Sequence, residues 1–146
     1  MLIICTVLGA ASASLRGFFV SRKTDDVAVR IVSLCRLARS MAVSEGRVYR
    51  LVFDGHGRAF YLTAQEEGAF RQPRTGLGRR FRLPDEVDLE LYVSGVSAGR
   101  DYVDFFPDGR AEPATVRLID IKGGLVEVTC AAPSEPFAVT SPEDGQ

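Results

Sequence analysis

The residues best suited to chemistry are one serine between two glycines and a single histidine. Gly95–Gly99 reads Gly-Val-Ser-Ala-Gly, the pattern that exposes a nucleophilic serine in α/β-hydrolases. Those enzymes place the histidine after the serine, whereas His56 precedes Ser97 here and lies between two glycines at an expected hairpin tip. We therefore interpret Gly95–Gly99 as a surface loop and His56 as an exposed turn residue with no second metal ligand near it in the sequence.

A carboxylate pair for general acid–base catalysis is the next candidate. The acidic residues that could form one follow each other closely: Asp85, Glu86, Asp88 and Glu90. Strict alternation places Asp88 and Glu90 on one face of an exposed strand, where their charges repel, so a solvated or cation-facing surface is favoured. The sequence also contains no Walker loop, dinucleotide-binding glycine motif, zinc-ligand spacing or EF-hand loop. We expect no enzyme activity, no cofactor and no metal site.

Length and composition are those of one globular domain. The chain has 146 residues, of which 46% are hydrophobic and 25% charged, which argues against a disordered chain and a multidomain enzyme. The net charge is −1, so no global field favours nucleic acid or an anionic membrane. Residues 1–80 hold 13 basic against 6 acidic side chains and residues 81–146 hold 5 against 13, so the charge is split along the chain.

Basic and aromatic residues interleave between positions 47 and 82, as they do in proteins that bind single-stranded nucleic acids. The residues concerned are Arg71, Arg74, Arg79, Arg80 and Arg82, with Phe70 and Phe81. These arginines could contact phosphates, or they could face the acidic C-terminal half of the same or a neighbouring molecule. The second interpretation needs no additional partner, and we expect no nucleic acid partner.

The N-terminal third predicts a helix with an apolar first half and an amphipathic second half. Residues 1–15 carry no charge, but at 1.5 Å per residue they reach roughly 22 Å, short of a bilayer core of about 30 Å. Thr24–Asp26 could cap a separate second helix, or one helix could run through to the neighbourhood of Gly46. The apolar stripe recurs at three- and four-residue steps: Val27, Ile31, Leu34, Cys35, Ala38, Met41 and Ala42.

After Gly46 the periodicity is that of extended strands. The predicted strands are Val48–Phe53, Arg58–Leu62, Val87–Val93, Tyr102–Phe106, Thr115–Ile121 and Leu125–Thr129. Asp54–Gly57 predicts a hairpin turn, and the polar segment 64–80, with its glycines and proline, predicts a mobile loop. One helix followed by five or six antiparallel strands gives an α+β fold class.

Three cysteines, Cys5, Cys35 and Cys130, are too few and too scattered for a disulfide scaffold or a metal site. If the helix lies on the sheet, Cys35 faces inward. Cys35 and Cys130 are then either two separate buried thiols, which we favour, or a bridge formed in an oxidising compartment.

Several segments carry a family resemblance: Leu37–Val43, Arg50–Asp54, Arg58–Leu62, Ala114–Leu118 and the Gly123-Gly124 turn. The most specific is the turn after Phe105, formed by Phe106, Pro107, Asp108, Gly109 and Arg110. Together they resemble the H-type minor pseudopilins of type II secretion systems, the GspH/FimT family of the type IV pilin-like proteins. The resemblance covers nearly the whole chain and implies a pilin-like fold, in which a long N-terminal helix packs on an antiparallel β-sheet head.

The resemblance also implies a role. Members are non-enzymatic subunits held in the bacterial inner membrane as single-pass proteins with a periplasmic head, and they join other pseudopilins near the tip of a short pseudopilus that supports export of folded proteins. It divides the chain into a helix, 1–46, and a β-rich head, 47–146. Within the helix, residues 1–21 are the membrane and filament-core part and residues 22–46 the amphipathic part.

One departure from the family pattern concerns the leader. The basic leader and the G-F-T-L-I-E motif that prepilin peptidase cleaves are missing, and residues 1–15 align with the helix just after that motif. We expect that the start codon is assigned too late or that the chain was trimmed. The peptidase is a partner if an upstream leader exists.

Assembly would then use two surfaces. Small residues allow close helix approach and bulky ones add contacts, and the helix residues concerned are Leu8, Gly9, Ala10, Leu15, Phe18 and Phe19. In the head, the basic region from Arg71 to Arg82 is expected to meet the acidic residues 85–90 of a neighbour.

Two alternatives stay open. One is a FimT-like minor pilin that binds DNA for uptake. It is disfavoured because relatives of that kind carry arginines in the C-terminal tail, whereas residues 134–146 contain no lysine or arginine. The other is a soluble cytoplasmic binding module whose first fifteen residues form a buried strand or helix.

Overall fold

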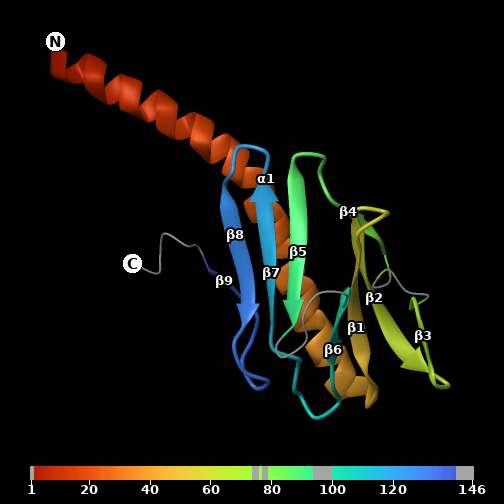
Figure 1. Cartoon of the computed structure of the whole chain (residues 1–146). Helices are drawn as coiled ribbons and strands as arrows, with labels where there is room; N and C mark the ends of the chain where they lie inside the picture. Colours follow the sequence, from red (N-terminus) through yellow and green to blue (C-terminus); the bar gives the residue numbers. More distant parts are fainter. Residues whose placement is uncertain (1, 74–75, 77–78, 94–99, 141–146) are drawn as a thin grey trace.

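The computed structural model describes residues 2–73, 76, 79–93 and 100–140, with side chains from residue 23 onward. Its first element is the helix α1 (Leu2–Glu45), which continues beyond the edge of the strands at its N-terminal end (Figure 1). A single continuous helix is therefore correct, and Thr24 lies buried within it instead of capping a second helix. In the described part of the chain, no helix has an apolar stretch long enough to cross a membrane.

The helix ends at a glycine, as its sequence predicts. Gly46 has a φ of +68°, a left-handed conformation that favours glycine. The backbone N–H groups of Gly46 and Arg47 both donate to the carbonyl oxygen of Ala42, at 2.9 and 3.3 Å. This is the usual way in which a C-terminal glycine satisfies free carbonyl groups and turns the chain out of a helix.

Two antiparallel sheets follow. The first has the order β3-β2-β1-β6, with β4 paired to β2. Its strands are β1 (Tyr49–Asp54), β2 (Ala59–Glu66), β3 (Ala69–Arg71), β4 (Phe81–Arg82) and β6 (Tyr102–Phe105). The second has the order β5-β7-β8-β9. Its strands are β5 (Val87–Val93), β7 (Ala114–Asp120), β8 (Leu125–Cys130) and β9 (Ala138–Thr140).

The core lies between α1 and the two sheets. In Figure 1 the C-terminal half of the helix runs behind both sheets, and it contacts β1, β6, β7, β8 and β9. The predicted apolar stripe is buried there, apart from Met41, which is half-buried: Val27, Ile31, Leu34, Cys35, Ala38 and Ala42. Ile31, Leu51 and Leu118 are fully buried, from the helix and one strand of each sheet. The α+β, pilin-like architecture predicted from the sequence is confirmed.

One segment differs from its prediction. Residues 64–80 are not a loop throughout, because β2 continues to Glu66 and β3 pairs with it. The two strands are joined by Glu67 and Gly68, whose φ values of +53° and +83° are those of a tight two-residue hairpin turn. The polar composition of this hairpin concealed it, since β3 is an edge strand with little buried surface.

Candidate interaction surfaces

The N-terminal residues singled out for assembly all lie on α1: Leu8, Gly9, Ala10, Leu15, Phe18 and Phe19. Their side chains lie outside the described part of the structure, as do the whole of Arg74 and Ser97. The helical spacing of these residues is therefore established by the backbone, and their contacts remain predictions.

The basic surface comprises the described arginines between positions 71 and 82, namely Arg71, Arg79, Arg80 and Arg82. It includes a contact with the turn of the first hairpin, between β1 and β2. The Asp54 carboxylate accepts the backbone N–H groups of His56 and Gly57 at 3.1 and 3.0 Å, and the guanidinium of Arg80 at 2.8 Å. The Gly57 N–H and Arg80 lower the pKa of Asp54. His56 is exposed in this turn, as expected from the sequence. Arg80 is thus held against its own head rather than freely displayed.

The other arginines of this surface form no ion pair with a described carboxylate. Arg71, on β3, and Arg79 are both exposed. The guanidinium of Arg79 lies 5.7 Å from the centroid of the Phe81 ring, within range of a cation–π contact. Arg79 therefore presents charge to solvent and keeps part of its side chain against an aromatic ring.

The acidic residues before and within β5 are partly paired inside the chain. Glu86 accepts from Lys23 of α1 at 3.0 Å, and this contact lowers the pKa of Glu86. Asp88 pairs with Arg58 at 3.0 Å, and Asp85 is exposed in the preceding turn. Because these pairs are exposed to solvent, each stabilises the fold little and can exchange with a charge on another molecule.

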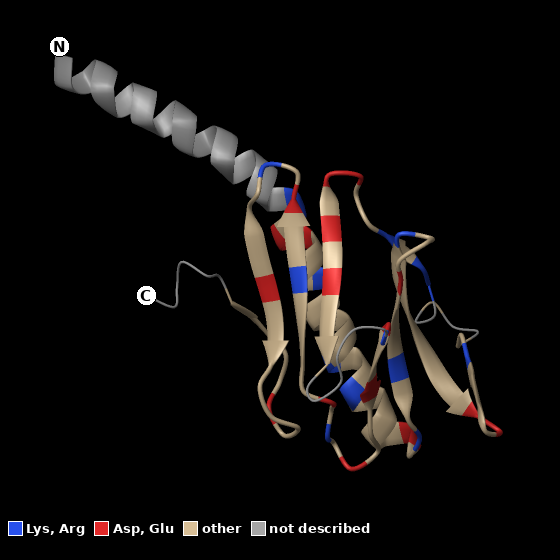
Figure 2. Ribbon diagram, viewed as in Figure 1, with Lys and Arg blue, Asp and Glu red and all other residues tan. Residues whose placement is uncertain are grey.

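Basic and acidic residues are close neighbours in the second sheet. Figure 2 shows acidic bands on β5 and β8 on either side of a basic residue on β7. Arg117 of β7 bonds Glu127 of β8 at 3.2 Å and is paired in register with Glu90 of β5. Glu90 itself accepts the Tyr92 hydroxyl at 2.8 Å. Acidic and basic strands therefore alternate on this sheet, although all of these residues belong to the acidic half of the sequence.

The turn that carried the resemblance is a compact structural element. Gly109, with a φ of +91°, donates its backbone N–H to Phe106 at 3.1 Å, and the Arg110 N–H bonds Asp108 at 3.0 Å. Just beyond it, Ala111 donates to the Pro133 carbonyl oxygen at 3.0 Å. The turn therefore leads the chain from the first sheet to the second. This structural role accounts for the residue pattern of the turn, and no catalytic role is needed to explain it.

A charged and aromatic cluster, which the sequence reasoning missed, lies on the face of the first sheet away from α1. Arg50 of β1 bonds both carboxylate oxygens of Asp104, at 2.7 and 3.2 Å. The same guanidinium lies between the rings of Phe70 and Tyr102, at 3.7 and 3.8 Å from their centroids. Arg50 and Asp104 are directly paired in register, so opposite charges at facing positions of two predicted strands were the available signal.

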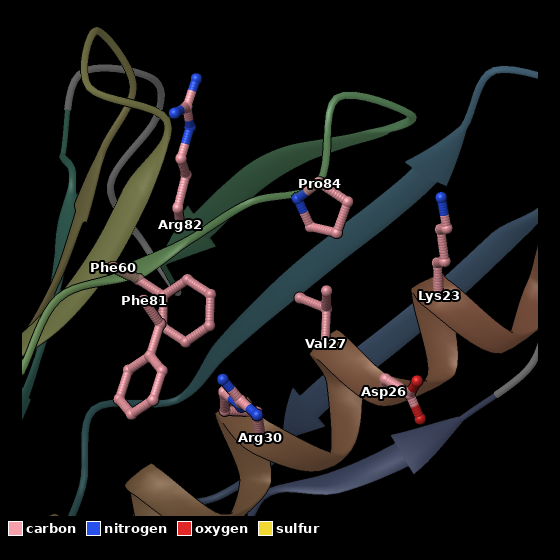
Figure 3. Close-up of a pocket in the computed structure, with 8 residues that line it drawn as sticks. All are labelled: Lys23, Asp26, Val27, Arg30, Phe60, Phe81, Arg82 and Pro84. Carbon is pink, nitrogen blue, oxygen red and sulfur yellow. The ribbon is translucent and has the colours of Figure 1, made fainter.

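A pocket of ≈ 230 Å³ opens between α1 and β4 (Figure 3). Its lining consists of Lys23, Asp26, Val27, Arg30, Phe60, Phe81, Arg82 and Pro84. In Figure 3 Val27 and Arg30 project from the helix toward the two phenylalanine rings, and Arg30 lies 4.7 Å from the Phe81 centroid. The apolar floor and basic rim could bind an anionic apolar group, but four of these side chains already have partners: Lys23 pairs with Glu86, and Arg30 and Phe60 both contact the Phe81 ring.

Groups that support catalysis are scarce among the described residues. No cluster of three or more histidine, cysteine, aspartate or glutamate side chains there could hold a metal ion. Cys35 and Cys130 are separate free thiols, both buried, as favoured from the sequence. Burial raises the pKa of the Cys35 thiol far above its ordinary value, and it raises that of Cys130 as well. Neither thiol is suited to act as a nucleophile.

Comparison with protein families gives one match. Residues 27–132 match the model of the family described as Type II transport protein GspH. None of the curated proteins compared matches the sequence.

Solved structures of low sequence identity share the fold. The minor pseudopilin EpsH from the type II secretion system of Vibrio cholerae has a TM-score of 0.72 and 11% identity, over 84% of this chain and 99% of that one. The solution structure of Escherichia coli GspH has a TM-score of 0.65 and 15% identity, over 86% and 93%. The type IV minor pilin FimU of Pseudomonas aeruginosa has a TM-score of 0.61 and 14% identity, over 88% and 95%.

Proposed function

The chain belongs to the GspH family of type II transport proteins, and we propose that it serves as a minor pseudopilin of a type II secretion system. In this proposal it catalyses no reaction. It joins other pseudopilins near the tip of a short pseudopilus and so supports the export of folded proteins.

The observation that carries the proposal is the length of α1 compared with the sheets that it covers. Its 44 residues make a helix about 66 Å long, whereas the seven residues of β5 or β7 span about 23 Å. Strands of that length can cover only part of the helix, and the buried helix residues whose side chains are described lie between Thr24 and Ala42. Residues 1–15 carry no charge, and an apolar segment of that length at the far end of the helix favours a partner other than this head.

We assign three functional parts to the chain. Residues 1–21 lie in the inner membrane before assembly and in the core of the filament afterwards, residues 22–46 anchor the head, and residues 47–146 form the periplasmic head. One apolar helix suits both environments because lipid tails and apolar helices are similarly hydrophobic. Gly9 and Ala10 allow close helix approach, and Leu8, Leu15, Phe18 and Phe19 supply larger contact surfaces. A leader upstream of residue 1 would make prepilin peptidase a further partner.

In the head, we propose a charged contact between neighbouring subunits. Within residues 71–82, the exposed arginines that form no ion pair with a described carboxylate include Arg71, Arg79 and Arg82, and Asp85 is an acidic counterpart. Arg80, Glu86 and Asp88 would join the contact only by exchanging their present partners. Such a contact orients the heads more than it adds affinity, and it weakens at high salt.

The test separates membrane retention from assembly. Gly9→Leu and Ala10→Leu, made together in the full-length protein, keep residues 1–15 apolar but prevent close helix approach. We expect unchanged recovery in the membrane fraction and about a tenfold fall in co-purification with the other pseudopilins, which corresponds to about 1.4 kcal/mol. Leu15→Ile is the matched control and should change neither. Full co-purification of the Gly9→Leu, Ala10→Leu variant would refute assembly through this helix.

A further inference from the structure

Among the residues that the structure describes, backbone groups on the outer edge of β5 have no partner. Ile121 donates its backbone N–H to the Glu86 carbonyl oxygen at 3.0 Å, so Glu86 directs its backbone toward the neighbouring strand. In an antiparallel ladder this direction alternates, which gives the inward positions to Asp88 and Glu90. Leu89 and Leu91 therefore direct their N–H and C=O groups to the other side, away from β7.

A side chain already occupies the first outward position. The guanidinium of Arg58 donates to the Val87 carbonyl oxygen at 2.6 Å, which confirms that odd-numbered residues of β5 face outward. Arg58 also donates to the Pro84 carbonyl oxygen at 3.1 Å. In the part of the chain that the structure describes, no such donor or acceptor reaches Leu89 or Leu91.

The open edge forms one wall of a groove between the two sheets, with a volume of ≈ 510 Å³. The other wall comes from the β1–β2 hairpin and from the chain that enters β6, and the lining includes Phe53, Gly55, Leu83, Leu89, Leu91 and Asp101. Leu89 and Leu91 are only half-buried. The groove thus combines free backbone groups with apolar side chains, which is the combination that strand addition uses.

The charges around the groove indicate what kind of segment fits it. Arg58 is neutralised by Asp88, and Arg100 is neutralised by Glu112. Glu90 and Asp101 form no ion pair with a described residue. The net acidic groove therefore favours an occupant that carries a lysine or arginine.

We propose that the free edge of β5 binds an extended segment of a neighbouring pseudopilin, which adds a strand beside Leu89 and Leu91. The segment is apolar at the positions over these leucines and basic at the position near Glu90 and Asp101. The identity of the partner rests on the proposed function, whereas the mode of binding rests on the backbone of β5. This contact is separate from the arginine surface at Arg71 and Arg79.

The experiment places a photo-crosslinking amino acid at Gly55 of the full-length protein in its own cells. Gly55 lines the groove, and an added side chain there meets nothing within 4 Å. A second crosslinker, at the exposed Val29 of α1, reports filament assembly independently. We expect both positions to crosslink to another pseudopilin.

Two substitutions at one residue then test strand addition. Leu91→Pro removes the outward N–H but none of the ladder bonds to β7, and proline is tolerated at such edge positions. Leu91→Val keeps the N–H and is the matched control. We expect Leu91→Pro to reduce the Gly55 crosslink at least tenfold, while Leu91→Val and the Val29 crosslink are unaffected. If Leu91→Pro also lowers the Val29 crosslink, it impairs assembly in general, and other substitutions are used in its place. These are Leu89→Pro, Glu90→Lys and Asp101→Lys, and each should reduce the Gly55 crosslink at least tenfold.

The crosslinking results distinguish failure of strand addition from failure of the proposed function. A Gly55 crosslink that survives these substitutions, or that is absent while Val29 crosslinks, overturns strand addition and leaves the proposed function standing. A Gly55 crosslink to a second copy of this chain overturns the assignment of the partner. Absence of crosslinks from both positions in the otherwise unchanged protein overturns the proposed function and the inference together.

Discussion

Replacing Arg50 by alanine tests whether the charged and aromatic cluster stabilises the head. The substitution removes both hydrogen bonds to Asp104 and the contacts with Phe70 and Tyr102. It also leaves the carboxylate of Asp104, whose side chain is 12% exposed, without a cation.

The magnitude follows from these contacts. Two cation–π contacts contribute about 1–2 kcal/mol in total. Loss of the cation from a partly buried carboxylate costs about 1–2 kcal/mol more, less than for a fully buried pair because the Arg50 side chain is 23% exposed. We therefore expect the free energy of unfolding to fall by about 3 kcal/mol and the melting temperature by about 6–12 °C.

Urea denaturation and thermal melting of the full-length protein measure the effect. Arg110→Ala is the matched control, because Arg110 pairs with Asp108 at 3.5 Å and both side chains are more than half exposed. That substitution should change the free energy of unfolding by less than about 0.5 kcal/mol. Equal losses for Arg50→Ala and Arg110→Ala would refute the reasoning, because they would mean that stacking and burial add nothing to a surface ion pair.

Three further substitutions test other features. Gly68→Val places a β-branched residue at a φ of +83° in the β2–β3 turn, and chemical denaturation should show a loss of about 1–3 kcal/mol; no loss would mean that the turn is not formed. The Tyr49 hydroxyl donates to Glu45 and is the main cause of that carboxyl's lowered pKa, so NMR titration of Tyr49→Phe should show the pKa of Glu45 rising toward its ordinary value. A carboxyl whose pKa is lower in the folded state contributes stability above its unfolded pKa, and this contribution is lost as the pH falls through the folded pKa. The free energy of unfolding should therefore depend less on pH across that acidic range in Tyr49→Phe than in the parent protein. Arg79→Glu should weaken the complex of co-purified pseudopilins at low salt and have less effect at high salt, and an unchanged complex at low salt would exclude this arginine from the contact.

The fold could be predicted wherever periodicity reports burial. Val27, Ile31 and Ala38 recur at helical spacing because one face of α1 lies on the sheets, and Val87–Val93 alternates because one face of β5 does. The short strands β3, β4 and β9 escaped prediction. All three residues of β9 are exposed, so its pairing with β8 depends on backbone bonds that leave no hydrophobic pattern.

The interaction surfaces could be predicted less well than the fold. Charge patterning singled out Arg80 and Asp88, but it could not predict their partners Asp54 and Arg58, which come from other parts of the chain. The Arg50 cluster requires the register of four strands, β3, β2, β1 and β6, which alternation alone does not determine. The groove beside Leu91 requires knowledge of which edge of β5 stays open, and that is a property of the order of strands.

The physical state of the native full-length protein tests the central claim most directly, namely that the apolar part of α1 is shared between the membrane and other subunits. Cell fractionation followed by size-exclusion chromatography measures that state. We predict recovery in the membrane fraction and in complexes with other pseudopilins, with detergent needed to release the protein. Recovery as a freely soluble monomer without detergent would contradict the account.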